Sequence, residues 1–164
     1  MAKPTKHAPL ICTICMILAI IGIIIGLVTL KPLIPIFFLL PTVIYEVYRT
    51  EGKSTRASSI ILLVVLVAEI ILIIFKVNFN LAEYLGTTEK TIGGYLVPLG
   101  DIKIVGPTIM AILSVILFIK TYGAYTKWLA VIIFVTSFAI IYTIDPVVFQ
   151  ELFKYAVQQG VDSI

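Results

Sequence analysis

The sequence predicts an all-α fold, a polytopic bundle of transmembrane helices with five spans and a short amphipathic helix at the C-terminus. Three observations predict it. The chain of 164 residues is 60% apolar and only 13% charged, with a mean hydropathy of +1.14, whereas soluble domains carry about 25% charged residues. Its apolar residues form runs close to the roughly 20 residues that a helical span requires. These runs are continuous and do not alternate with polar residues, so helices are expected and barrel strands are not.

The same composition excludes several classes of protein. So few charges cannot cover the surface of a soluble domain, and so many apolar residues are not typical of a disordered chain. Two cysteines are too few for a disulfide-stapled secreted module. A net charge of +3 without a run of Lys or Arg argues against a nucleic-acid partner.

Five apolar runs give the expected spans. The second run is the shortest, contains Pro35 and Pro41, and rises only about 24 Å at 1.5 Å per residue. A re-entrant segment, which enters the membrane and turns back, is the alternative for this run. The expected transmembrane domain covers residues 1–144, with an outer loop at 78–103 and spans at about 10–30, 33–48, 57–77, 104–120 and 128–144.

The charges between the runs predict the orientation. Short cytoplasmic loops carry an excess of Lys and Arg, and the short segments 49–56 and 121–127 are both basic. Five spans place both segments inside, whereas a re-entrant segment at 33–48 would place 49–56 outside. We therefore expect a multi-pass protein of the cell membrane with a cytoplasmic N-terminus and an external C-terminus.

Two segments outside the spans are candidates for docking. In the outer loop, residues 80–85 are expected to form a helical turn before several glycines break any longer element. A loop of this length is usually functional or held by a partner. Residues 145–164 predict the amphipathic helix, with Asp145 as its N-cap. It would lie on the outer leaflet, on the bundle itself or on a partner, and its candidate docking residues are Phe149, Leu152 and Phe153.

Glu69 is the one acidic residue well inside an apolar run. An ionised carboxylate at the bilayer centre costs about 2.5–3.5 kcal/mol, and Glu69 lies about 16 Å along the helix from Ser58, which suggests the midplane. Two roles remain open. Glu69 could bind a proton or a cation, or it could be a neutral acid hydrogen-bonded to a hydroxyl of a neighbouring helix. The candidate hydroxyls are those of Thr29, Ser114 and Ser137.

Small residues line one face of the first span. Gly22 and Gly26 form a G-x-x-x-G motif, which Cys15 and Ala19 extend at helical spacing. Such faces allow close helix packing, either with a following helix of the chain or with another chain. The C-x-x-C formed by Cys12 and Cys15 is read as part of this face, because no second cysteine pair is present to relay electrons.

The sequence therefore predicts no catalytic residues, no metal site and no cofactor. We expect a non-catalytic integral membrane subunit that packs within and stabilises a larger membrane protein complex. Its partners would be the lipid bilayer and other membrane protein subunits, or a second copy of itself as an oligomer. The alternative is a small oligomeric transporter or channel that uses Glu69 as a proton- or cation-binding carboxyl.

Overall fold

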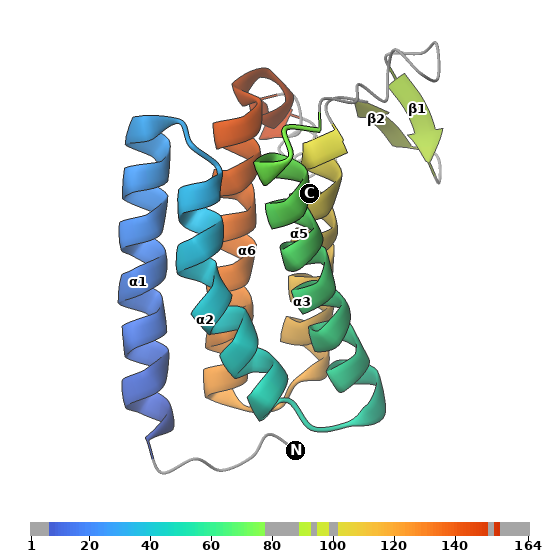
Figure 1. Ribbon diagram of the computed structural model, residues 1–164. Coiled ribbons are helices and arrows are strands. Elements are labelled where there is room, and N and C mark those ends of the chain that lie inside the picture. Colours follow the sequence, from blue (N-terminus) through green and yellow to red (C-terminus); the bar gives the residue numbers. More distant parts are fainter. Residues whose placement is uncertain (1–6, 78–88, 93–94, 99–101, 151–152, 155–164) are drawn as a thin grey trace.

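The computed structural model describes residues 7–77, 89–92, 95–98, 102–150 and 153–154. Its long helices lie side by side and alternate in direction along the chain (Figure 1). The helices are α1 (Ala8–Thr29), α2 (Leu33–Arg49), α3 (Lys53–Ile74), α5 (Ile102–Lys120) and α6 (Ala124–Ile144). We call the end with the α2–α3 and α5–α6 turns the turn end. The opposite end, beside the two short strands described below, is called the hairpin end.

Four of these helices, α1, α3, α5 and α6, are long and apolar enough to cross a membrane. The protein is thus a multi-pass helical membrane protein. The observed α3 begins at Lys53 and ends at Ile74, so it lies earlier in the chain than the predicted run 57–77. Helix α2 has 17 residues, which rise about 26 Å, and is shorter than the other four.

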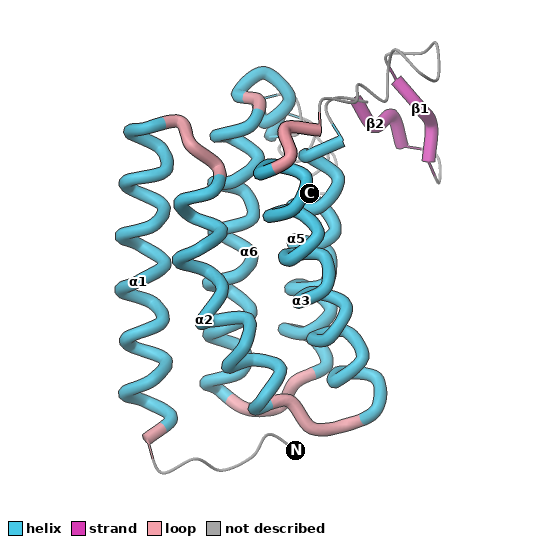
Figure 2. Tube along the Cα trace, in the orientation of Figure 1, coloured by secondary structure: helices cyan, strands magenta, loops and turns pink. Residues whose placement is uncertain are grey.

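Helix α2 is continuous from Leu33 to Arg49 even though it contains Pro41. A proline inside a helix lacks the N–H donor and usually bends or breaks it, but here the helix continues to the other end of the bundle (Figure 2). The described backbone of α2 therefore contains no turn back of the kind that a re-entrant segment requires.

The helices form a closed ring that is filled in the middle. Around the ring, α1 contacts α2, α2 contacts α3, α3 contacts α5, α5 contacts α6, and α6 contacts α1. Helices α2 and α6, which are both members of the ring, also contact each other across it. The ring is therefore closed in the middle. The core side chains with no exposed surface are Ile36, Leu39, Val43, Leu62, Leu66, Met110, Leu117, Leu129, Ile133 and Ile140.

Helix α1 packs into the bundle through small residues. Its buried positions are Ala8, Cys12, Cys15, Ala19, Gly22 and Gly26. A methyl group added to Gly22 would collide with Phe38 of α2, and one added to Gly26 would lie 2.7 Å from Pro35. The predicted G-x-x-x-G motif therefore packs against α2 of the same chain.

Two short strands lie in the segment expected to be an outer loop. Strand β1 (Glu89–Ile92) pairs antiparallel with β2 (Tyr95–Pro98), and Thr91 is opposite Leu96. This hairpin is not among the predicted elements, because the glycines of the loop predict only that any longer helix is broken there. Two glycines between short runs with β-branched residues are also a hairpin signal. The helical turn expected at 80–85 lies outside the described residues.

The chain turns over the end of the bundle at Asp145. Its Oδ1 atom accepts hydrogen bonds from the backbone N–H groups of Val147, at 2.9 Å, and Val148, at 3.2 Å, which is the geometry of an N-cap. Residues 146–150 are helical, as are 153–154. Leu152 and residues 155–164 lie outside the described part, so the full predicted length of this amphipathic helix is not described.

Candidate functional site

Glu69 is buried on α3, with only 1% of its surface exposed. A methyl group added to Gly106 of α5 would collide with its carboxylate. The two helices therefore approach each other closely at this point, because a glycine faces the acid. Residues three apart on a helix are neighbours, so Lys103 lies next to Gly106 on α5 and places a basic residue in the same region.

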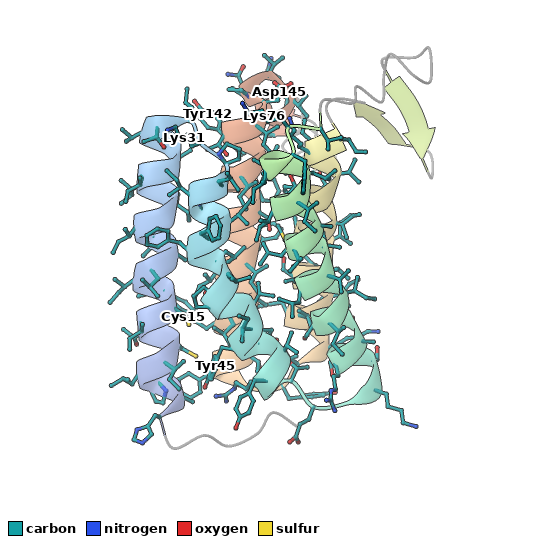
Figure 3. All side chains as sticks on the ribbon, viewed as in Figure 1. Cys15, Lys31, Tyr45, Lys76, Tyr142 and Asp145 are labelled. Carbon is teal, nitrogen blue, oxygen red and sulfur yellow. The ribbon has the colours of Figure 1, made fainter. Side chains whose placement is uncertain are left out.

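The structure gives the position of Glu69 along its helix. It lies five residues before Ile74, the last residue of α3, which corresponds to about 8 Å from the helix end. Its neighbour Gly106 is four residues from the start of α5 at Ile102. Because α3 begins four residues earlier than the predicted span, Glu69 lies in the second half of its helix, and its position near the bilayer midplane stays a prediction. Glu69 lies toward the hairpin end, where Lys31, Lys76 and Asp145 are also found (Figure 3).

The hydroxyls proposed as partners of Glu69 donate elsewhere. Those of Thr29, Ser114 and Ser137 donate to backbone carbonyls three or four residues earlier in their own helices, at 2.7, 2.6 and 2.7 Å. Local bonds of this kind compete with contacts between helices. The protons of these three hydroxyls are therefore engaged within their own helices, and the hydrogen bond between Glu69 and a hydroxyl of a neighbouring helix stays a prediction.

A second group of buried polar residues lies on α2 near the turn end, and we call it the α2 polar cluster: Thr42, Glu46, Arg49 and Thr50. All four are at most 5% exposed. Thr50 Oγ1 donates to Glu46 Oε1 at 2.9 Å, whereas Glu46 Oε2 is buried and has no hydrogen-bond partner among the described residues. The guanidinium of Arg49 lies 5.4 Å from the ring centre of Tyr125 on α6, which is within range of a cation–π interaction.

This cluster is not among the predicted site residues. Glu46 is the last charge of the short second run, and Arg49 belongs to the basic segment 49–56 that follows it. Residues 42, 46 and 49 are four and three apart, which places them on one face of a helix. Because α2 extends to Arg49, that face is buried in the bundle. The spacing of four and three residues between positions 42, 46 and 49 is the pattern from which this cluster could have been predicted.

A cavity of about 180 Å³ opens beside the cluster at the turn end, and we call it the end pocket. It lies where the α2–α3 turn meets the α5–α6 turn. Gly52 of the first turn has a φ of 113°, a conformation that favours glycine. The lining residues are Thr50, Glu51, Thr55, Lys120, Thr121, Tyr122 and Thr126.

The predicted docking residues of the C-terminal segment divide into two kinds. The ring of Phe149 packs edge-on against Tyr142, at 5.4 Å between ring centres, and against Phe138, at 6.3 Å. Phe149 therefore packs on α6 of its own chain. Phe153 stacks on Phe149 but is 58% exposed, so it remains accessible to a partner. Leu152 lies outside the described residues.

Cys12 and Cys15 are free thiols, and both are buried in the small-residue face of α1. Across the described ranges, no group of three or more His, Cys, Asp or Glu residues is arranged to hold a metal ion. No protein-family model, no curated protein and no solved structure matches this chain. The geometry of the bundle and its polar sites is thus the basis for inferring a function.

Proposed function

We propose that this protein is a non-catalytic integral membrane subunit that packs within and stabilises a larger membrane protein complex. The observation that carries the proposal is the β1–β2 hairpin, which projects away from the helices (Figure 1). Within the described residues, each strand has its main contacts with the other strand and not with a helix. The hairpin is thus placed to contact something outside its own bundle.

The physics of small hairpins supports a partner at this site. An isolated two-stranded hairpin is marginally stable at best in water, and it usually needs another strand or a helix to pack against. Its outer edges also carry backbone N–H and C=O groups that can pair with a strand of another chain. A hairpin that stands off its own bundle therefore favours a partner chain, either another subunit or a second copy.

The proposed layout has five crossings, a cytoplasmic N-terminus and an external C-terminus in the cell membrane. Support comes from α2, which is continuous and antiparallel to its neighbours (Figure 2). The basic segments 49–56 and 121–127 both lie at the turn end, as the positive-inside rule requires if this end is cytoplasmic. The hairpin then lies outside, where an external partner domain could reach it.

The alternative is a small oligomeric transporter or channel with Glu69 as its proton- or cation-binding carboxyl. The burial of Glu69, at 1% exposure, favours it. Two other observations weigh against it: the contact of α2 with α6 across the ring, and the tight fit of the carboxylate against Gly106. Both favour a bundle built for packing, and we therefore prefer the role of a subunit.

The test targets the hairpin and leaves the bundle intact. In the register of the hairpin, Ile92–Tyr95 and Lys90–Val97 are the hydrogen-bonded pairs, so Lys90→Pro removes a backbone donor of the ladder and should break the pairing of β1 with β2. After gentle extraction, we expect the wild-type protein to migrate with other chains at fixed stoichiometry, and the variant to migrate without them at an unchanged unfolding temperature. Lys90→Thr, which removes the same charge but keeps the backbone N–H, is the control and should retain the complex. A wild-type protein that runs as a lone monomer, or a Lys90→Pro variant that keeps its partners, would refute the proposal.

A further inference from the structure

The hydroxyl groups of the four threonines in the end pocket all donate hydrogen bonds to other atoms of the protein. Thr50 donates to the Glu46 carboxylate at 2.9 Å, and Thr55 donates to the Glu51 carbonyl at 2.9 Å. The hydroxyls of Thr121 and Thr126 donate to backbone carbonyls at 2.6 and 2.7 Å. A hydroxyl has one proton and two lone pairs, so these four side chains can offer a ligand only acceptor oxygens.

A carboxylate adds to this supply of acceptors. Glu51, in the turn between α2 and α3, lines the pocket, and an ionised carboxylate is purely an acceptor. The walls of the pocket thus favour a ligand group that carries several N–H or O–H donors.

Lys120 restricts the charge of such a ligand. It lines the pocket, and its Nζ donates to Ser54 Oγ at 3.3 Å. A bare cation would be repelled by this ammonium group, and a bare anion would find few donors, since the threonine protons are engaged. A zwitterion fits both constraints: its ammonium group can contact the acceptor oxygens while its anionic group contacts Lys120.

The position of the pocket indicates where such a ligand comes from. Its lining residues lie at the turn end, at the ends of α2, α3, α5 and α6, the level at which lipid headgroups meet a helix bundle that spans a membrane. Tyr122 at its rim is 95% exposed, and tyrosines are enriched at this level of the membrane. The volume of about 180 Å³ is below the roughly 300–1,000 Å³ of drug-sized sites, so the pocket suits a headgroup and not a whole lipid.

We propose that the end pocket binds the headgroup of an aminophospholipid. Its primary ammonium group donates to the oxygens of the threonines and Glu51, and its phosphate lies beside Lys120. A quaternary ammonium group has no N–H to donate and is typically bound over aromatic faces. The pocket should therefore distinguish phosphatidylethanolamine from phosphatidylcholine, two lipids that differ only in the methylation of this nitrogen.

The experiment compares thermal unfolding of the purified full chain in detergent with either lipid added, both with the same acyl chains. We expect an unfolding temperature about 2–4 °C higher with phosphatidylethanolamine than with phosphatidylcholine, as for a ligand that binds only the folded state. Equal temperatures with the two lipids would overturn the proposal. Free phosphoethanolamine should have little effect, and a full shift from it would overturn the assignment to a lipid.

Thr55→Val removes one partly exposed acceptor oxygen while nearly keeping the side-chain shape, and it should abolish the difference between the two lipids. Thr108→Val on α5 is the matched control. Both threonines are partly exposed and both donate to the backbone carbonyl four residues earlier, at 2.9 and 2.8 Å, but Thr108 does not line the pocket. It should keep the difference. If Thr55→Val does not fold, Glu51→Gln in the exposed turn replaces it, with the same expected loss. A difference that persists in the variant tested would overturn the proposal.

Discussion

The carboxylate of Glu69 occupies the space that any side chain at position 106 would need. At this contact, α3 supplies an acid and α5 supplies a glycine, and the basic Lys103 lies one turn earlier on α5. The arrangement keeps a buried carboxylate close to the end of its helix, where the cost of burying it is smaller than at the bilayer centre. The burial of the Glu69 carboxylate and the packing of α3 against α5 therefore depend on the same contact.

Gly106→Ala should destabilise the protein by about 1–3 kcal/mol, the usual cost of overpacking a filled site. The added methyl group would collide with the Glu69 carboxylate and push α3 away from α5. Chemical unfolding in detergent measures the loss. Gly123→Ala serves as control, because Gly123 has a φ of −83° that alanine can adopt. In the double variant with Glu69→Ala, the effect of Gly106→Ala should shrink, and full additivity would contradict this account of the contact.

Glu69→Gln should leave folding and complex assembly intact, because glutamine keeps the shape of the side chain and removes only its charge. The measurement is ion-coupled flux in reconstituted vesicles together with migration of the gently extracted protein. We expect no flux that depends on Glu69. Proton or cation flux in the wild type that disappears in a folded Glu69→Gln variant would instead establish the transporter alternative.

Single residues were predictable to different degrees from the sequence. Glu69 was visible because a charge inside a long apolar run is conspicuous. Glu46 and Arg49 were not, because charges are ordinary near the end of a span, and their shared face emerges only once α2 is known to reach Arg49. For the hydroxyls proposed to bond Glu69, the sequence did not show that their protons bond carbonyls of their own helices, which Ser and Thr in helices often do.

Helix α1 shows how an element can be buried without large side chains. Its buried residues are all small, and most of its large aliphatic residues are exposed, because lipid tails solvate them as well as a protein core does. Close approach to α2 therefore depends on the absence of side-chain volume along one stripe. This makes α1 sensitive to added methyl groups on one face and tolerant of substitution on the other.

Gly22→Ala should accordingly destabilise the α1–α2 contact by about 1–3 kcal/mol, since the new methyl group would collide with Phe38. Unfolding in detergent gives the magnitude. Ile24→Ala, at a position 56% exposed, is the comparison on the outward face and should have a much smaller effect. Combining Gly22→Ala with Phe38→Ala should recover part of the loss, and a Gly22→Ala variant as stable as the wild type would contradict the packing described.

At the level of elements, apolar runs predicted the helices because the bilayer requires continuous apolar stretches and satisfied backbones. Their ends shifted by a few residues, since Lys and Arg at a helix end can extend to the interface and so do not stop a helix. The β1–β2 hairpin was missed for another reason. Its strands have four residues each, too few for a periodic pattern, and only the pair of glycines between them indicated the turn.

The whole bundle combines a filled centre with two chemically different ends. The end pocket and the α2 polar cluster lie at the turn end, whereas Glu69 lies in the half of α3 that leads to the hairpin end. Between them, the core consists of fully buried aliphatic side chains. Such a molecule is suited to making separate contacts at its two ends, a partner at one and a lipid headgroup at the other, with a rigid apolar body between them.

An odd number of crossings makes a prediction that single-cysteine labelling can check. The two native cysteines are buried among small residues, so alanine at both positions should give a folded, cysteine-free background. Into this background, one cysteine is introduced at a time at exposed positions of either end. A membrane-impermeant thiol reagent is then applied to intact and to permeabilised cells.

Lys31→Cys and Lys76→Cys should react in intact cells, whereas Lys53→Cys and Lys127→Cys should react only after permeabilisation. The reason is that α2, although rising only about 26 Å, joins opposite ends of the bundle, and the bilayer can thin locally to match a short helix. If 33–48 turned back within the membrane, Lys53→Cys would react together with Lys31→Cys. The pair at positions 31 and 53 thus isolates the crossing of the shortest helix, on which the external position of the hairpin depends.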